Sequence, residues 1–578
     1  MNPSTALGRV LVDELVRSGV REVVLSPGSR SAALALALHA ADARGELRLH
    51  VRIDERSAAF LALGLAKGSH RPVPVVTTSG TAAANLHPAI LEASHARVPL
   101  IAITADRPTE LRGTEANQTT DQVKLYGDAV RAYVEVAAPE VVPASAAAWR
   151  AVVARVVGAA VGRTGEGPIA RPAGGPVHLN VAFREPLVPD AEDVDGPLPA
   201  ALAGRPDGAP WRRPAPVTPE PASTLPLGPR TVVVAGDDAG PAARMLAEEA
   251  AWPLLAEPSS GARNGTSPIA TYRLLLGLPE LADRIERVVV FGHPTLSRPI
   301  SRLLSRDDVD VVAVGSAPYT DPGNRVSAVY AAVRAEARDE SAWFDQWKRA
   351  DAATLAAVEE IVLAPAPGLT SAMGFPVFTP PLNGWQVARI VSQDVPPGGQ
   401  LVVGSSSPIR DLDLMAVPYP VGQRRMITAN RGLAGIDGMV STAVGAALGR
   451  RSDEGTLALM GDLTFLHDSN GLVTGRSEPE PELTVVVVSD NGGSIFATLE
   501  QGDAPYAAAF ERVFATPTAV SIGKLCRAMG VVHRLVTTSD ELEEALAAAD
   551  GLRVVEARVD RADRREIDLQ IRRAARLH

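Results

Sequence analysis

Thr456-Leu-Ala-Leu-Met-Gly-Asp462 is an apolar run that ends in Gly-Asp, and Thr484-Val-Val-Val-Val-Ser-Asp-Asn-Gly492 is a second run that ends in Asp-Asn-Gly. Short apolar runs bounded by turn residues predict buried strands of a parallel sheet. Asp462 and Asp490 are 28 residues apart (490 minus 462), which fits strand, helix and strand. Because parallel strands end at one edge of the sheet, where α/β folds bind ligands, both carboxylates should lie there.

The two carboxylates are candidate ligands of a divalent cation. Mg²⁺ in proteins binds one or two carboxylates together with phosphate oxygens. The pair Gly492-Gly493 lets a diphosphate approach the backbone, and the following helix offers its amino end to negative charge. A lone Gly-Asp after a strand is more often ordinary turn chemistry. The paired spacing of Asp462 and Asp490 favours a metal and diphosphate site.

Length and composition limit the class of protein. A chain of 578 residues holds two to four domains at roughly 150 residues each. A net charge of −10 argues against a dedicated nucleic-acid binder, which needs Lys and Arg to neutralise phosphates. Cys526 is the only cysteine, so no intrachain disulfide can form. No stretch approaches the ~18 apolar residues of a membrane span. We expect a cytoplasmic protein without integral membrane association.

The pattern of runs predicts three consecutive α/β domains with mainly parallel sheets. The expected order is a first domain over 1–190, a Pro-rich linker over 191–230, a central domain over 231–363, a second linker over 364–399 and a third domain over 400–578. Expected strands are Glu22–Leu25, Leu47–Ile53, Val73–Thr77, Pro99–Thr104, Pro176–Val181, Thr231–Ala235, Arg287–Phe291 and Val309–Val314. Expected helices include Ser57–Lys67, Pro241–Ala250, Ile269–Leu276 and Ser341–Val362.

Two features of the first domain stand at strand-to-helix corners. Glu55 precedes an expected helix, where a carboxylate commonly stabilises the helix amino end by ~0.3–1 kcal/mol. The turn Thr78-Ser-Gly80 is rich in small residues, which allows a flat ring to lie near the backbone, although it also suits simple close packing.

Together these residues carry a resemblance. Glu55, the Thr-Ser-Gly turn 23 residues later (78 minus 55), Gly461-Asp462 and Asp490-Asn491 resemble thiamine-diphosphate-dependent enzymes of the decarboxylase and acetohydroxyacid-synthase type. The resemblance implies the thiamine-diphosphate-binding fold, in which a pyrimidine-binding domain comes first and a diphosphate-binding domain third. It covers most of the chain and matches the domain order above.

The resemblance assigns the cofactor residues. Glu55 would bind the aminopyrimidine ring and favour the tautomer that takes the proton from thiazolium C2. Ile436 matches the apolar wedge between the rings, and Ile495 and Phe496 would wall the pocket. The implied cofactor contacts are Glu55, Thr78, Gly80, Ser406, Ile436, Asp462, Leu463, Ile495 and Phe496, and the implied ligands of Mg²⁺ (or Mn²⁺) are Asp462, Asp490 and Gly492.

Longer motifs are similar to one family of that superfamily, the 2-succinyl-5-enolpyruvyl-6-hydroxy-3-cyclohexene-1-carboxylate synthases. They are Ser26-Pro-Gly-Ser-Arg-Ser31, Thr104-Ala-Asp-Arg-Pro108, Ala116-Asn-Gln118, Pro176-Val-His-Leu-Asn-Val181, Phe183-Arg-Glu-Pro186 and Asn430-Arg-Gly432. The family is a carboligating transferase of menaquinone biosynthesis: it decarboxylates 2-oxoglutarate and adds the remaining succinyl carbanion to isochorismate. One departure is Asp490, where the family often has asparagine.

Both substrates carry two carboxylates, and arginine forks bind carboxylates through parallel hydrogen bonds. By the motif match, the forks would be Arg30, Arg107, Arg410 and Arg431, the neutral donors Ser29, Asn117, Gln118 and Ser406, and a weaker candidate Arg298. The implied catalytic residues are Glu55, Ser29, Arg107, Gln118 and Arg410.

Two alternative functions stay open from the residues. A simple 2-oxoacid decarboxylase or acetohydroxyacid-synthase-like enzyme is weakened because the chain contains no His-His pair, which such decarboxylases often use. A non-catalytic scaffold that binds the cofactor would tolerate the loss of Glu55, which is present. The resemblance also implies at least a homodimer, since the superfamily pairs the first domain of one subunit with the third of another; a homotetramer is equally compatible.

Overall fold

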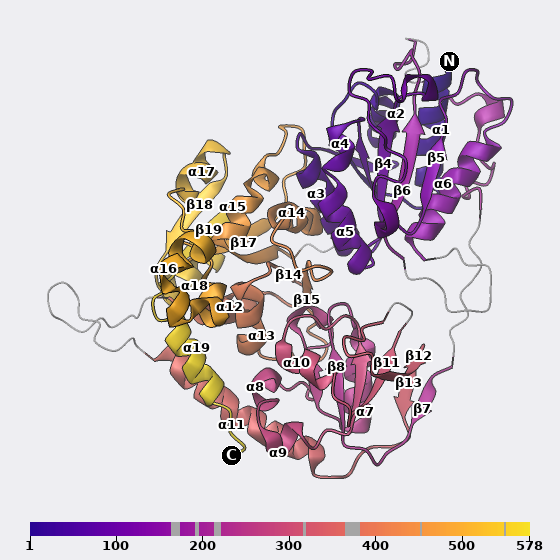
Figure 1. The fold of residues 1–578 in the computed structure, drawn as a ribbon. Helices are drawn as coiled ribbons and strands as arrows, with labels where there is room; N and C mark the ends of the chain where they lie inside the picture. Colours follow the sequence, from indigo (N-terminus) through magenta and orange to yellow (C-terminus); the bar gives the residue numbers. More distant parts are fainter. Residues whose placement is uncertain are drawn as a thin grey trace. The chain divides into compact units, whose positions relative to one another are not determined.

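The computed structural model describes residues 1–162, 174–190, 196–212, 221–315, 319–364, 382–450, 454–547 and 551–578. These residues form two compact units, which Figure 1 shows together. The first unit comprises the described residues of 1–218, 432–451 and 468–481. The second comprises those of 219–431, 452–467 and 482–578. Parts of both predicted linkers, 191–195, 213–220 and 365–381, lie outside the described residues.

A six-stranded parallel sheet organises the first unit. Its order is β2-β1-β3-β4-β6-β5. The strands are β1 (Glu22–Leu25), β2 (Arg48–Val51), β3 (Val73–Thr77), β4 (Leu100–Asp106), β5 (Tyr133–Val136) and β6 (Val177–Ala182). One face packs against α1 (Pro3–Arg17), α2 (Ala32–Ala43) and α6 (Ala147–Ala160) in a continuous apolar core. The helices α3 (Glu55–Ser69) and α5 (His87–His95) lie on the other side (Figure 1).

Among its described residues the second unit contains three further parallel sheets, the smallest being the pair of β7 (Ser223–Leu225) and β13 (Val333–Ala335). The five-stranded sheet has the order β12-β11-β10-β8-β9, and the six-stranded sheet has the order β15-β14-β16-β17-β19-β18. The first set is β8 (Thr231–Ala235), β9 (Leu254–Ala256), β10 (Arg287–Phe291), β11 (Asp310–Val314) and β12 (Val326–Tyr330). The second set is β14 (Gln400–Val403), β15 (Met426–Ala429), β16 (Thr456–Gly461), β17 (Leu483–Ser489), β18 (Val532–Val536) and β19 (Leu552–Arg558).

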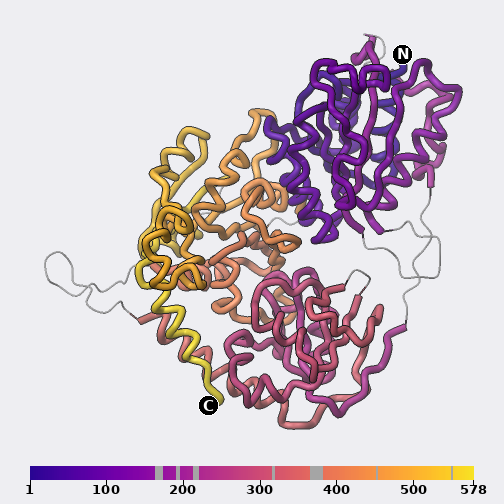
Figure 2. Tube along the Cα trace, in the orientation of Figure 1, coloured from indigo at the N-terminus to yellow at the C-terminus, as the bar shows by residue number. Residues whose placement is uncertain are grey.

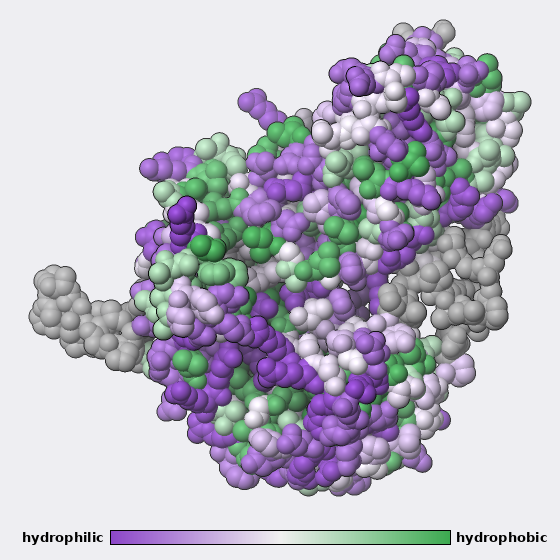
Figure 3. All heavy atoms as spheres, in the orientation of Figure 1, coloured by the Kyte–Doolittle hydropathy of each residue, from purple (hydrophilic) through white to green (hydrophobic). Residues whose placement is uncertain are grey.

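Helices connect and cover these strands. Around the five-stranded sheet they are α7 (Pro241–Ala250), α8 (Tyr272–Leu275), α9 (Pro279–Ala282), α10 (Arg298–Leu303) and α11 (Trp343–Leu363). Around the six-stranded sheet they include α12 (Gly384–Asp394), α13 (Ser407–Met415), α15 (Asp462–His467), α17 (Ile522–Ala528), α18 (Ser539–Ala547) and α19 (Arg564–Arg573). The C-terminal helix α19 runs beside α11 (Figure 2), and the two share an apolar cluster with α12 and α13. Hydrophilic side chains gather over α19 on the visible face (Figure 3).

The sheets repeat one strand order. Numbered along the chain, the first and third sheets both read 2-1-3-4-6-5, and the central sheet reads 2-1-3-4-5 from its other edge. This is the doubly wound order whose switch point lies between the first and third strands. The mainly parallel α/β prediction is therefore confirmed, and equivalent strand ends occur in each sheet.

The first unit also includes α14 (Met439–Gly449), which packs on α3 backbone to backbone. A methyl group added at Gly64 would lie 2.1 Å from the Thr442 carbonyl oxygen, and one at Gly445 would lie 2.1 Å from the Leu61 carbonyl oxygen. Glycine spaced four residues apart on both helices removes the side chains that would hold the axes further apart. This contact aligns the two loops that precede α3 and α14.

Most predicted strands agree with the structure within one or two residues, and three differences have physical reasons. The strands β5, β9 and β12 are short or half-exposed and lack the dense apolar runs that revealed the others. The helix expected over 269–276 begins only at Tyr272, because the Asp351 carboxylate accepts hydrogen bonds from the Ala270 and Thr271 N–H groups. Within the second expected linker, α12 forms behind a capping box of Asn383 and Gln386.

None of the helices in the described ranges is long and apolar enough to cross a membrane.

Candidate functional site

The predicted site residues follow equivalent strands of the first and third sheets. In the first unit, β1 leads to Ser29 and Arg30, β2 to Glu55, β3 to Thr78 and Gly80, and β4 to Arg107, Asn117 and Gln118. In the second unit, β14 leads to Ser406 and Arg410, β15 to Arg431, β16 to Asp462 and Leu463, and β17 to Asp490, Gly492, Ile495 and Phe496. All lie beyond the carboxyl ends of strands one to four of their sheet. Arg298 is the exception, since it follows β10 of the central sheet.

Arg107 is the centre of a buried polar group in the first unit. Its guanidinium donates to the Ser79 hydroxyl and, at 2.9 Å, to the Asn117 carbonyl oxygen. Gln118 donates its amide to the Ser79 carbonyl oxygen at 3.0 Å, and has a positive φ of 53°. Burial and the neighbouring charge of Arg30 lower the pKa of Arg107. Two adjacent guanidiniums, both mostly buried, make this corner of the unit a place for an anion.

The turn after β3 packs closely against the loop after β1. A methyl group at Gly28 would lie 2.3 Å from Cβ of Thr78, so the loops after β1 and β3 touch through a glycine. Gly80 has a φ of +85°, which favours glycine. Its N–H donates to the side-chain oxygen of buried Gln122 at 3.0 Å. The sequence did not reveal Gln122; a buried amide with no motif around it leaves no signal in a single chain.

Glu55 is the first residue of α3. Asp54 caps the helix, its carboxylate accepting from the Arg56 and Ser57 N–H groups at 2.9 and 3.3 Å. Asp54 provides the cap, while Glu55 places its negative charge in the first turn of α3, as its position suggested. The Glu55 carboxylate is half-buried, and it has no hydrogen bond or ion pair within the part of the chain that the structure describes. It is available to a ligand.

Ile436 lies in the loop before α14, in the first unit, and is half-buried. Ser29 is exposed in the turn after β1.

Asp462 and Asp490 emerge from neighbouring strands, as the sequence predicted. β16 and β17 pair in parallel with Gly461 opposite Val488. The Asp462 carboxylate accepts from the Leu463 N–H at 2.7 Å and from the Gly492 N–H at 3.1 Å. Burial and the nearby charge of Asp490 raise the pKa of Asp462 to about 7.

Burial likewise raises the pKa of Asp490, against a hydrogen bond from Ser494 and the charges of Arg564 and Arg561. Neither carboxylate of this pair has a Lys or Arg within ion-pair distance among the described residues. No cluster of three or more His, Cys, Asp or Glu side chains that could hold a metal occurs in the described ranges. Two adjacent carboxylates, Asp462 buried and Asp490 half-buried, without an ion-pair partner among the described residues fit a hard cation that draws its other oxygens from backbone and phosphate.

Ser406 and Arg410 lie one helical turn apart at the start of α13. Ser406, just before α13, has a φ of +76°, a strained conformation for serine that persists at functional sites. The Arg410 guanidinium donates to the Ser406 carbonyl oxygen at 2.7 Å. Burial and the charges of Arg431 and Arg273 lower the pKa of Arg410 to about 10. Such a guanidinium is short of negative partners.

A cavity of about 480 Å³ brings three predicted residues together. Arg298, Arg410 and Ile495 line it with residues of α8 and α19. Arg298 pairs with Glu500 at 2.6 Å, and its side chain is 63 % exposed. Phe496 lies on the same short helical turn as Ile495, its ring 5.8 Å from that of Phe514.

Arg431 is held in place by a chain of hydrogen bonds through Thr295 to Glu257, which the sequence did not reveal. Its guanidinium donates to the Thr295 hydroxyl at 3.0 and 3.2 Å. The N–H groups of Thr295 and Leu296 donate to buried Glu257 at 3.0 and 2.8 Å. Burial raises the pKa of Glu257 to about 8. Glu257 is therefore a neutral or easily neutralised acid behind the arginine.

The chain is similar in sequence to known proteins. Residues 5–125 match the thiamine pyrophosphate enzyme N-terminal TPP binding domain, and residues 414–557 match the thiamine pyrophosphate enzyme C-terminal TPP binding domain. The chain is 49 % identical to the 2-succinyl-5-enolpyruvyl-6-hydroxy-3-cyclohexene-1-carboxylate synthase of Nocardioides sp., over 98 % of this chain and 97 % of the relative. Proteins of the same name from Kineococcus radiotolerans (48 %; 96 % of each chain) and Saccharopolyspora erythraea (45 %; 100 % of this chain, 99 % of the relative) are also similar.

Near-full-length identity of this size, with both cofactor-domain matches in the expected order, shows the family. The chain belongs to the 2-succinyl-5-enolpyruvyl-6-hydroxy-3-cyclohexene-1-carboxylate synthases, thiamine-diphosphate-dependent enzymes.

Proposed function

We propose that the chain decarboxylates 2-oxoglutarate and joins the remaining succinyl group to isochorismate, forming 2-succinyl-5-enolpyruvyl-6-hydroxy-3-cyclohexene-1-carboxylate in menaquinone biosynthesis. The observation that carries this proposal is the 49 % identity over 98 % of the chain to a relative of that name. Arginines at equivalent strand ends suit two substrates that carry two carboxylates each.

Bound thiamine diphosphate supplies the nucleophilic carbon and the electron sink that decarboxylation of a 2-oxo acid requires. Glu55 holds the proton at a ring nitrogen of the aminopyrimidine, a role that its half-buried, unpartnered carboxylate supports within the described residues. Thr78 and Gly80 lie in a turn of small residues, which allows the pyrimidine to approach the backbone closely. Ile436, Ile495 and Phe496 supply the apolar walls, with Ser406 and Leu463 as further contacts.

Asp462, Asp490 and Gly492 would hold Mg²⁺ or Mn²⁺, which would supply positive charge for the diphosphate. The support is electrostatic: each carboxylate raises the cost of the other's charge, and a cation removes that cost. Arg564 and Arg561 lie near enough to Asp490 to offset part of its negative charge.

The substrate carboxylates bind to Arg30, Arg107, Arg410 and Arg431, with Ser29, Asn117, Gln118 and Ser406 as neutral donors. Each charge-assisted hydrogen bond contributes roughly 1.5–3 kcal/mol. Arg107 and Arg410 also stabilise charge that develops as carbon dioxide leaves and the new bond forms, with Ser29 and Gln118 beside them. Arg298 would have to release Glu500 before it could bind a substrate.

We further propose a homo-oligomer in the cytoplasm with the three-domain division given above, in which α12 lies in the second linker and the third domain covers 400–578. Light scattering at several protein concentrations distinguishes a dimer from a tetramer.

The experiment is incubation of the protein with thiamine diphosphate, Mg²⁺, 2-oxoglutarate and isochorismate, following carbon dioxide release and isochorismate loss together. Equal rates support the proposal. Carbon dioxide release without isochorismate loss would instead support a simple 2-oxoacid decarboxylase. Cofactor binding without either change would leave the non-catalytic scaffold.

A further inference from the structure

The cavity of about 480 Å³ in the second unit is lined by six arginines, Arg273, Arg298, Arg410, Arg564, Arg565 and Arg572. Four of them pair with carboxylates that also line it. The pairs are Arg298 with Glu500, Arg564 with Asp411, Arg565 with Asp503 and Arg572 with Asp568. The positive charge that the cavity does not itself neutralise therefore comes from the other two, Arg273 and Arg410.

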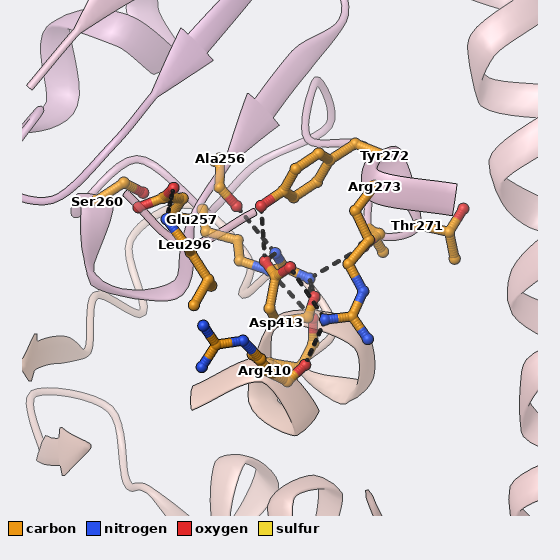
Figure 4. Close-up of polar contacts among 12 residues, drawn as sticks. Ala256, Glu257, Ser260, Thr271, Tyr272, Arg273, Leu296, Arg410 and Asp413 are labelled. Carbon is orange, nitrogen blue, oxygen red and sulfur yellow. Dashed lines mark hydrogen bonds and ion pairs between the residues drawn. The ribbon is translucent and has the colours of Figure 1, made fainter. Parts of the chain in front are cut away.

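Arg410 has no carboxylate within 4 Å in the described ranges, and Arg273 shares one. Arg273 reaches from α8 and donates to the Arg410 carbonyl oxygen at 2.9 Å, and it lies 3.8 Å from Asp413 (Figure 4). Asp413 already pairs with Arg263 at 3.3 Å and accepts from the Tyr272 hydroxyl at 3.0 Å. The Asp413 carboxylate therefore lies near the guanidiniums of both Arg263 and Arg273, and it neutralises only part of the Arg273 charge.

Arg273 lines the cavity and keeps donors that are not used within the described residues. Its side chain is 16 % exposed, and only one of its five N–H groups donates to an acceptor among the described residues. Figure 4 shows the Arg410 side chain extending away from Asp413, while Arg273 lies on the opposite side of it. The two guanidiniums therefore offer two separate points of attachment on one cavity wall.

We propose that Arg273 is a further substrate-binding residue, forming with Arg410 two cationic subsites for the two carboxylates of one dicarboxylate substrate. This inference rests on the proposed function. A largely buried, partly unpaired guanidinium such as that of Arg273, whose side chain is 16 % exposed, costs free energy that an arriving carboxylate recovers, and a fork suits a carboxylate better than a point charge. The repulsion between Arg273 and Arg410, which contributes to the lowered pKa of Arg410, is relieved in the same step.

The test compares Arg273→Met and Arg273→Lys with Arg572→Gln, using the holoenzyme with Mg²⁺. Arg572 lines the same cavity but has its own carboxylate partner, so its replacement is the matched control. We expect Arg273→Met to raise KM for one of the two substrates by at least ~10-fold, with kcat changed much less, since a charge-assisted hydrogen bond is lost. Arg273→Lys should raise the same KM less, and Arg572→Gln should match the wild type.

Two results would overturn the inference: unchanged KM values for both substrates, or a loss of kcat without a change in KM, which would mark Arg273 as a support for Arg410 alone. If Arg273→Met does not fold, Arg273→Lys decides by the same KM criterion. Measuring the wild type distinguishes the inference about Arg273 from the proposed function. A wild type that turns over neither substrate contradicts the proposed function itself.

Discussion

At the scale of single residues, the neighbouring carboxylates of Asp54 and Glu55 have two different roles. Asp54 caps α3, and this leaves the next carboxylate without a protein partner among the described residues. The bond-making chemistry requires a group that can share a proton with the cofactor, and a capping carboxylate could not do so.

Glu55→Gln should therefore bind thiamine diphosphate and Mg²⁺ with near-normal affinity but lose ~10²–10⁴-fold in turnover, the range expected for a proton-transfer group. Calorimetry and steady-state rates measure the two effects separately. Asp54→Asn is the control, because an amide oxygen still caps the helix. Near-normal turnover of Glu55→Gln would remove Glu55 from the chemistry.

Glu257 predicts a pH dependence of stability. Its folded pKa of about 8 lies above the ordinary value near ~4.3, so the folded chain binds the extra proton between these values. The stability that Glu257 contributes is full below pH ~4.3 and falls as the pH rises through about 8, by about 1.4 kcal/mol per unit. Burial is the main cause; Asp413 and Asp237 act in the same direction, while the Leu296 N–H and Arg431 oppose it.

Glu257→Gln removes the ionisation and keeps the size. Relative to the wild type, its unfolding temperature should therefore rise steadily from pH 5 to pH 8. Glu280→Gln, an exposed carboxylate on α9, should show no such trend. A constant difference between Glu257→Gln and the wild type across this range would mean that Glu257 is charged in the folded state.

At the scale of elements, α3 and α14 set the spacing of two site loops, because Glu55 begins α3 and Ile436 precedes α14. Gly64→Ala should destabilise the first unit by ~1–3 kcal/mol, since a methyl group would meet the Thr442 carbonyl oxygen at 2.1 Å. This cost exceeds the ~1 kcal/mol that alanine gains over glycine in a helix. Urea unfolding measures it.

Gly455→Ala is the matched control, because a methyl group there meets nothing within 4 Å. Equal stability of the two variants would mean that the helices can separate without cost.

The sequence predicted those secondary-structure elements whose formation depends on residues close together in the chain. The runs at β1, β3, β8 and β10 were located to the residue, because fully buried parallel strands are apolar throughout. It predicted a helix at α8 but not its later start at Tyr272, nor the hydrogen bonds that hold Arg431, since both depend on side chains from distant segments, Asp351 and Glu257. The arginines at strand ends were recognisable from motifs, whereas Arg273 lies in no motif and is distinguished only by its neighbours.

At the scale of the whole molecule, the first and third sheets repeat one strand order, and the proposed cofactor residues follow equivalent strands of both sheets. The first and third sheets offer the same four strand ends, one set with Glu55 and the other with Asp462 and Asp490. A homo-oligomer would supply both sets to each cofactor.

Asp462→Ala should weaken Mg²⁺-dependent cofactor binding by more than the ~10–100-fold that the loss of an outer-shell partner costs. If the site is completed by another subunit, the same variant should also shift the oligomer toward monomer, which light scattering at several concentrations detects. Asp503→Ala, whose carboxylate pairs with Arg565 on the cavity wall, is the control for a lost acidic residue nearby. A fully active wild-type monomer would contradict the shared site.

The central claim is that one protein both removes carbon dioxide from 2-oxoglutarate and bonds the carbon left behind to isochorismate. The most direct measurement supplies 2-oxoglutarate labelled with ¹³C at the keto carbon, together with isochorismate, thiamine diphosphate and Mg²⁺. The account predicts that the label appears in the ring-bearing product, at the carbon newly bonded to the ring. Label that accumulates only in free succinic semialdehyde, with isochorismate unchanged, would contradict it.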